Sequence, residues 1–187
     1  MNKPSENFSW PIQQVLRELG GGHGTHVRRF GSKDLMEIVL VEPQIPQNTG
    51  SIARTCAATD TPLHLVGPLG FEITEKAVRR AGLDYWPFVK LAQHDSWADY
   101  IQQSKPGKVW LFSKFGRSLY TDASFAPDDA LVFGSETKGL GAEFLESFPT
   151  HQILRIPIST PHVRSLNLSN AVAIALYEAR RQLKLDC

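Results

Sequence analysis

The chain changes from a strand to a helix within residues 36–54, which read MEIVLVEPQIPQNTGSIAR. Residues 36–41 form an apolar run typical of a buried strand, and Pro43 and Pro46 end it because proline cannot donate to a sheet. We predict that a helix follows, and Asn48 has the composition to cap its start. A buried strand that leads directly into a helix is the repeating unit of α/β proteins.

The same alternation of strands and helices continues to the end of the chain. Apolar runs predict strands at residues 63–66, 109–112, 130–133 and 153–158, with a short extended piece at 85–91. Helical spacing predicts helices at residues 73–81, 97–103, 142–148 and 168–183. We therefore expect an α/β domain in which a mostly parallel sheet carries helices on both faces.

The segment before Met36 differs from the rest of the chain. Residues 10–19 have the spacing of a short amphipathic helix, and the glycine-rich run at residues 20–24 would break it. We predict an N-terminal arm or appendage, residues 1–35, followed by one domain, residues 36–187.

Composition excludes several classes of protein. The chain has 187 residues with a net charge of +1, which argues against a protein held on nucleic acid by bulk charge alone. No apolar run approaches the roughly 20 residues of a membrane span, and residues 1–7 lack an apolar signal core. We expect a cytoplasmic protein with no membrane partner. The two cysteines, Cys56 and Cys187, are too few for a disulfide framework, and we expect no metal.

Polar or glycine-rich loops follow three of the predicted strands, at residues 42–54, 133–141 and 156–170. Ligands of open α/β sheets bind at the carboxyl ends of the strands, so these loops form the candidate site. In the first loop, Arg54 lies about one and a half helical turns beyond Asn48 and can reach back toward the loop. The alternative is an ordinary asparagine cap followed by a surface arginine.

The second loop carries three glycines, which allow the backbone to approach a ligand, and one acid, Glu136. It is not a P-loop, because Lys138 precedes Gly139, and it lacks the dinucleotide fingerprint and the nucleophile elbow. The third loop is rich in hydroxyl and amide groups, and we expect Ser165 or Ser169 to cap the helix that follows. A plain glycine turn would equally explain the second loop taken alone.

Four stretches together resemble the SPOUT methyltransferases, and within them the tRNA (cytidine/uridine) 2′-O-methyltransferases of the TrmL (YibK) type. They are EPQIPQNTG at residues 42–50 with Arg54, RRAGLDY at 79–85, FGSETKGL at 133–140, and RSLNLSNAV at 164–172 after Ile156. The resemblance covers about residues 36–183, and the combination is specific although each stretch alone is weak.

The resemblance implies a trefoil-knotted α/β domain and an obligate homodimer with its site at the interface. It also implies S-adenosylmethionine as the cofactor. Carried over by position, the residues that contact this cofactor would be Phe112, Gly134, Ile156, Ser165 and Leu166.

The activity implied by the resemblance is 2′-O-methylation of a tRNA ribose, at the wobble nucleotide of the anticodon (a cytidine or a modified uridine). Arg54 would lie beside the 2′-hydroxyl, where a permanently protonated guanidinium orients the hydroxyl and stabilises developing oxyanion charge. Asn48, Glu136 and Asn167 would hold Arg54 and the ribose in place. Two alternatives stay open: methylation of another tRNA position or of rRNA, and a non-catalytic, dimeric RNA-binding domain of the same fold.

Overall fold

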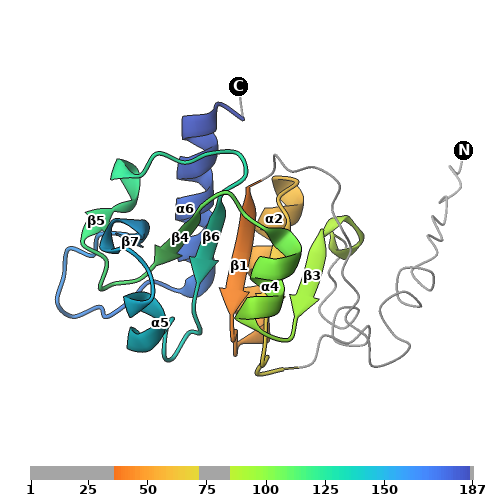
Figure 1. Cartoon of the computed structure of the whole chain (residues 1–187), viewed down its shortest axis with the longest axis horizontal. Coiled ribbons are helices and arrows are strands. Elements are labelled where there is room, and N and C mark those ends of the chain that lie inside the picture. Colours follow the sequence, from red (N-terminus) through yellow and green to blue (C-terminus); the bar gives the residue numbers. More distant parts are fainter. Residues whose placement is uncertain (1–35, 72–84, 186–187) are drawn as a thin grey trace, which may run out of the picture.

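The computed structural model of the chain describes residues 36–71 and 85–185. The strands in these ranges form one sheet in the order β3-β2-β1-β6-β4-β7-β5, and every neighbouring pair is parallel (Figure 1). Their bounds are β1 (Glu37–Val41), β2 (Leu63–Val66), β3 (Leu91–His94), β4 (Val109–Phe112), β5 (Ser118–Leu119), β6 (Ala130–Phe133) and β7 (Ile153–Arg155). The predicted α/β class with a mostly parallel sheet is confirmed, while the knot stays a prediction.

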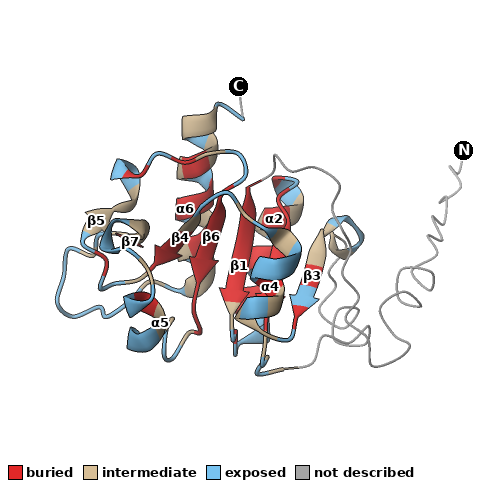
Figure 2. Ribbon diagram, viewed as in Figure 1, coloured by how far each residue is buried: buried red, intermediate tan, exposed pale blue. Residues whose placement is uncertain are grey.

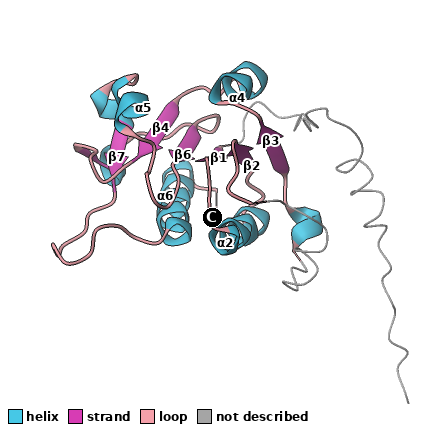
Figure 3. Ribbon diagram, turned by 90° about the horizontal axis from the view of Figure 1, so that it is seen from below, coloured by secondary structure: helices cyan, strands magenta, loops and turns pink. Residues whose placement is uncertain are grey.

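Helices cover both faces of the sheet, as expected (Figure 3). One face carries α2 (Pro46–Ala58) and α6 (Leu168–Leu183), and the other carries α4 (Trp97–Ser104) and α5 (Ala142–Glu146). Single turns of 3-10 helix occur at η1 (Trp86–Phe88), η2 (Tyr120–Asp122) and η3 (Thr150–Gln152). The predicted bounds of the last helix are those of α6, because its apolar stripe is long and regular.

The core consists of two apolar layers, one on each side of the sheet. Successive side chains of a strand point to opposite faces, so Ile38 and Leu40 of β1 pack beneath α2 and α6 while Val39 packs on the other side. In Figure 2 the central strands are buried, as parallel sheets between helices require.

Several element boundaries differ from the sequence-based predictions. The strand predicted at residues 153–158 ends at Arg155, because Pro157 has no backbone donor for the ladder. The extended piece predicted at residues 85–91 is η1 followed by β3, a strand that sequence reasoning missed. The helix predicted at residues 142–148 ends at Glu146. The helices predicted at residues 10–19 and 73–81, and the proposed arm, lie outside the described residues.

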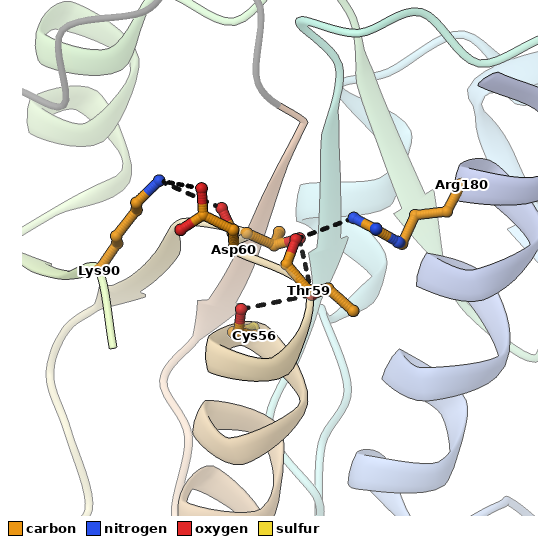
Figure 4. Close-up of polar contacts among 6 residues, drawn as sticks. Cys56, Thr59, Asp60, Lys90 and Arg180 are labelled. Atoms are coloured by element: carbon orange, nitrogen blue, oxygen red, sulfur yellow. Dashed lines mark hydrogen bonds and ion pairs between the residues drawn. The ribbon is translucent and has the colours of Figure 1, made fainter. Parts of the chain in front are cut away.

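The C-terminal end of α2 is fastened at the amino edge of the sheet, as Figure 4 shows. Nη1 of Arg180, in α6, donates to the carbonyl oxygen of Thr59 at 2.8 Å, where α2 ends. The Lys90 ammonium lies 2.7 Å from the Asp60 carboxylate and joins this end of α2 to the segment before β3. The N-terminal end of α2 lies at the opposite, carboxyl edge of the sheet.

A buried polar cluster lies beneath α4 at the start of β1. The Glu37 carboxylate, 8% exposed, accepts hydrogen bonds from the hydroxyls of Ser104 and Tyr100. His64 Nε2 lies 3.0 Å from the same carboxylate, and His64 Nδ1 lies 2.9 Å from His94 Nε2. Burial by itself would raise the pKa of Glu37, but His64 and the two hydroxyls hold that pKa below its usual value. Burial, reinforced by the charge of His64, lowers the pKa of His94.

Candidate functional site

The three loops identified in the sequence leave the same edge of the sheet. They follow β1, β6 and β7, and the order β1-β6-β4-β7 places these strands side by side or one strand apart. The carboxyl ends lie along the lower edge of the sheet in Figure 1. The loops therefore converge where α/β proteins bind ligands.

A carboxylate from the second loop organises the first. Glu136 accepts hydrogen bonds from the backbone amides of Gln44 and Ile45, at 2.9 and 3.2 Å, and from the Asn48 side chain at 3.0 Å. Ile45 is the N-cap residue of α2, and its own side chain makes no capping bond. A charged group from a distant part of the chain thus lies at the positive end of this helix, where it is electrostatically favourable.

The predicted role of Asn48 as helix cap is wrong. α2 begins at Pro46, because proline has the φ angle of a helix and needs no donor at the first position. Asn48 therefore lies inside the first turn. Its side chain makes no capping hydrogen bond and donates to Glu136 instead.

The third loop joins the same chain of hydrogen bonds. Asn167 Nδ2 donates to Asn48 Oδ1 at 2.9 Å, while Asn167 Oδ1 accepts from the backbone amide of Ser169 at 2.9 Å. Asn167 is thus the N-cap of α6, which corrects the prediction of a serine cap. The hydrogen bonds from Glu136 to Asn48 and from Asn48 to Asn167 connect all three loops through side chains. The structure thus brings these three predicted site residues together.

The environment of Glu136 keeps this residue ionised. Burial alone would raise its pKa, but the hydrogen bonds from Asn48 and from the backbone amides of Gln44 and Ile45 hold the pKa below its usual value. A carboxylate with this many donors is a poor general base and no general acid at neutral pH. Its geometry suits an acceptor that fixes the first loop.

Arg54 lies apart from this chain of hydrogen bonds. It is exposed on α2, and its Cζ lies 4.6 Å from the centroid of the Tyr85 ring. The Tyr85 hydroxyl donates to the carbonyl oxygen of Gly50, at 2.8 Å. Within the described residues, then, Arg54 packs on an aromatic ring, while the hydrogen bonds of Glu136 go to the first loop. Sequence reasoning missed Tyr85 as a partner of Arg54, although this residue ends the RRAGLDY stretch.

The second loop is a small closed hairpin. Ser135 and Gly139 exchange backbone hydrogen bonds of 3.2 and 2.8 Å, and Gly139 has a φ of 66°, which favours glycine. A Cβ on Gly134 would overlap the carbonyl group of Gly139. The need for glycine at position 134 thus comes from the backbone of the loop itself, where we had expected it to come from a ligand. Thr137, which sequence reasoning also missed, donates to the Gln44 side chain at 2.6 Å.

The residues predicted to contact a cofactor lie at the same edge. Phe112 ends β4, Gly134 follows β6, and Ile156 follows β7, and these strands are neighbours in the sheet. The Phe112 ring stacks on Phe133 with centroids 4.6 Å apart. Ser165 and Leu166 lie in the loop before α6, where Ser165 is exposed and Leu166 half-buried. Apolar side chains beside strand-end backbone groups suit an adenosine-type ligand, which needs flat apolar contacts and hydrogen bonds to its edges.

Residues 36–71 and 85–185 contain no group of three or more His, Cys, Asp or Glu side chains that could hold a metal ion. In the same part of the chain no helix has the length and apolar character needed to span a bilayer.

Comparison of the sequence with known proteins gives matches over most of its length. The model of the SpoU rRNA Methylase family matches residues 35–177. A tRNA (cytidine(34)-2′-O)-methyltransferase of Saccharophagus degradans is 47% identical over 149 residues, which are 80% of this chain and 96% of that protein. Another from Polaromonas sp. is 47% identical over 150 residues, which are 79% of this chain and 91% of that protein.

Solved structures agree with these matches. A structure concerned with the 2-OH methylation of C/U34 on tRNA has a TM-score of 0.74 and 47% identity, covering 82% of this chain and 99% of that one. An AdoMet-bound rRNA methyltransferase from Sinorhizobium meliloti has a TM-score of 0.67 and 25% identity, covering 81% of this chain and 58% of that one.

Proposed function

Because this chain belongs to the SpoU rRNA methylase family, we propose that it transfers a methyl group from S-adenosylmethionine to the ribose 2′-hydroxyl of tRNA nucleotide 34. The observation that carries the proposal is the chain of side-chain hydrogen bonds through Glu136, Asn48 and Asn167, which fixes three loops at one edge of the sheet. A site built this way serves a reaction in which positioning of two partners is the main task.

The choice of tRNA over rRNA rests on the degree of similarity. The relatives that are 47% identical over nearly their whole length carry names that specify cytidine 34 of tRNA. The rRNA methyltransferase from Sinorhizobium meliloti is 25% identical, and this chain covers 58% of it. The wobble nucleotide is therefore the preferred target, as a cytidine or a modified uridine.

S-adenosylmethionine supplies a methyl group that its sulfonium centre has already activated. Phe112, Gly134 and Ile156 would hold the cofactor at the ends of three neighbouring strands, with Ser165 and Leu166 closing over it from the third loop. Their chemistry fits, since the cofactor offers an adenine ring for apolar contacts and polar edges for backbone groups.

Arg54 acts on the ribose. The 2′-hydroxyl would give its proton to solvent water, and the guanidinium would orient the oxygen toward the cofactor and stabilise the negative charge that develops on it. Arg54 does not accept the proton, because a guanidinium stays protonated in proteins. Glu136, Asn48 and Asn167 keep the first loop, and with it α2, in place beneath the ribose.

We further propose that two copies of this chain form a homodimer. Alanines of α6 such as Ala175 and Ala179 are buried against this chain's own core, so they are not the surface that a partner would cover. Ile174 and Tyr177, 36% and 51% exposed, instead give α6 an apolar outer face. An exposed apolar face on a long helix is typical of subunit interfaces.

We further propose that residues 1–35 are an appendage to the methyltransferase domain. We also propose that the protein acts in the cytoplasm. The family match begins at residue 35, which supports this boundary.

The direct test uses the purified chain, labelled S-adenosylmethionine and tRNA transcripts. A transcript with cytidine 34 should gain one methyl on its ribose, located by mass spectrometry of nucleosides. A matched tRNA with a 2′-deoxy nucleotide 34 should gain none. Methylation of rRNA alone, or of a base, would overturn the proposed substrate. Tight RNA binding without S-adenosylmethionine binding would favour the non-catalytic domain.

A further inference from the structure

Tyr85 contacts the first turns of α2 at two points. Its hydroxyl donates to the carbonyl oxygen of Gly50, at 2.8 Å, and its ring lies under the guanidinium of Arg54, with Cζ 4.6 Å from the ring centroid. Gly50 and Arg54 are four residues apart in the helix, so they lie one above the other on the same face. Tyr85 thus lies along one turn of α2: its hydroxyl is bonded to Gly50 at the N-terminal side of the turn, and its ring contacts Arg54 at the C-terminal side.

Whether Arg54 packs on an aromatic ring or on a carboxylate decides how many of its N–H donors remain available to a substrate. A carboxylate partner would accept hydrogen bonds from the guanidinium and occupy part of its fork of N–H donors. An aromatic face attracts the cation electrostatically and accepts none of these bonds in the guanidinium plane. Arg54 is therefore restrained and keeps its donors for another acceptor.

Restraint is needed because Arg54 is exposed. A long side chain at the surface samples many rotamers, and ordering it costs entropy at the moment when a substrate binds. The Glu136 carboxylate does not provide the restraint, since its hydrogen bonds go to Gln44, Ile45 and Asn48. The Tyr85 ring is in contact with the guanidinium and is itself tied to the helix backbone.

We infer that Tyr85 is a positioning residue for methyl transfer, which orders the Arg54 guanidinium through its ring and leaves the N–H donors free for the ribose oxygen. This inference rests on the proposed function, because it assigns Tyr85 a role only in the step that Arg54 assists.

The test separates the ring from the hydroxyl. Tyr85→Phe keeps the ring and should lower the single-turnover rate by less than about threefold, whereas Tyr85→Leu removes the ring and should lower it on the order of tenfold. Both variants should keep the affinity for S-adenosylmethionine. Phe88→Leu is the matched control, since Phe88 is 70% exposed and only three positions away, and its rate should be that of the wild type.

A double-mutant cycle distinguishes positioning from general support of the fold. In an Arg54→Ala background, Tyr85→Leu should change the remaining rate by less than about twofold, because the group that it positions is gone. The same tenfold loss in that background would overturn the inference, and so would a normal rate for Tyr85→Leu alone. The Arg54 Nε–Hε NMR signal gives a readout without turnover. Its ring-current shift should persist in Tyr85→Phe and disappear in Tyr85→Leu.

The failure of the proposed function has a different signature. A wild-type chain that methylates no ribose would overturn the proposed reaction, and with it the role of Tyr85, even where the ring-current shift is present. Normal wild-type activity with additive Tyr85 and Arg54 effects would overturn the positioning role alone.

Discussion

Asn48 and Glu136 lie 88 residues apart in the chain and are joined by a hydrogen bond of 3.0 Å. The same Asn48 side chain accepts a hydrogen bond from Asn167, so one amide serves as donor to the second loop and acceptor from the third. Only a side chain with both functions can make both bonds, and that requirement leads to the first prediction.

Asn48→Asp should be more harmful than Asn48→Ala. Alanine removes two hydrogen bonds, which should lower the free energy of unfolding by about 1 kcal/mol. Aspartate also sets a second charge against Glu136, whose lowered pKa keeps it ionised, and should cost about 2 kcal/mol or more. Urea denaturation at pH 7 measures both values, with exposed Gln47→Ala as the control. Equal losses for the two variants would refute the charge argument.

Arg54→Ala should lower the rate of methyl transfer by about 10²- to 10³-fold, because the variant loses the donor that we propose stabilises charge on the 2′-oxygen. Arg54→Lys should not restore the rate. An ammonium can still pack on Tyr85, but it lacks the planar fork. Single-turnover assays with saturating tRNA measure the rate, and calorimetry should give wild-type affinity for S-adenosylmethionine. A near-normal rate for Arg54→Ala would exclude Arg54 from the mechanism.

Gly134→Ala should open the second loop. The new methyl group would overlap the Gly139 carbonyl, and backbone yields less readily than a side chain, so we expect a loss of about 1–3 kcal/mol in the free energy of unfolding. Affinity for S-adenosylmethionine should fall with it. Gly50→Ala is the matched control, since a Cβ there lies 3.9 Å from the Tyr85 hydroxyl, an ordinary contact. Wild-type stability and affinity for Gly134→Ala would show that the loop is not packed as described.

The Glu37 cluster should make the protein sensitive to acid. Folding lowers the pKa of both His94 and Glu37, from ordinary values of 6.5 and 4.5. A group whose pKa is lowered on folding contributes stability above its unfolded pKa and loses it as the pH falls toward the folded pKa. The free energy of unfolding should therefore decrease below about pH 6.5 through His94 and further below about pH 4.5 through Glu37.

Urea denaturation between pH 8 and pH 4 tests this dependence. His94→Gln should flatten the decrease between about pH 6.5 and pH 4.5 and keep the decrease at lower pH. An unchanged slope in this variant would assign the effect to other groups.

The proposed homodimer can be tested by measuring the assembly state at different protein concentrations. Sedimentation of the wild type should give a dimer down to nanomolar protein, and Ile174→Asp should give a folded monomer with reduced activity, because the substituted side chain is already partly exposed in the single chain. A wild-type monomer with full activity would contradict the proposed dimer.

Much of the fold could be predicted from the sequence because its signals are regular. The apolar runs of β1, β2, β4 and β6 and the long stripe of α6 leave little choice of element. β3 was missed because Gln93 and His94 break its apolar pattern, although His94 is buried by partners that only the folded sheet supplies.

The site could be predicted in part. The loops carry their polar residues directly after strands, so their convergence follows from parallel topology. The partners within the site do not follow from local pattern. Asn48 has the composition of a helix cap, and only the helix start at Pro46 redirects its side chain. Tyr85 contacts Arg54 from a segment whose position depends on the whole sheet.

The strand order also determines when the site can form during synthesis. β1 can pair with β2 as soon as residue 66 has emerged, but its other neighbour is β6, in which Ala130 pairs with Glu37. Pairings across long stretches of chain are slow, because the loop must close before the contacts stabilise it. Asn167 follows later still, so a nascent chain that lacks α6 would have every strand of the sheet but would leave part of the α2 face uncovered and have no complete site. The three loops can therefore be joined through their side chains only after the start of α6 has been synthesised.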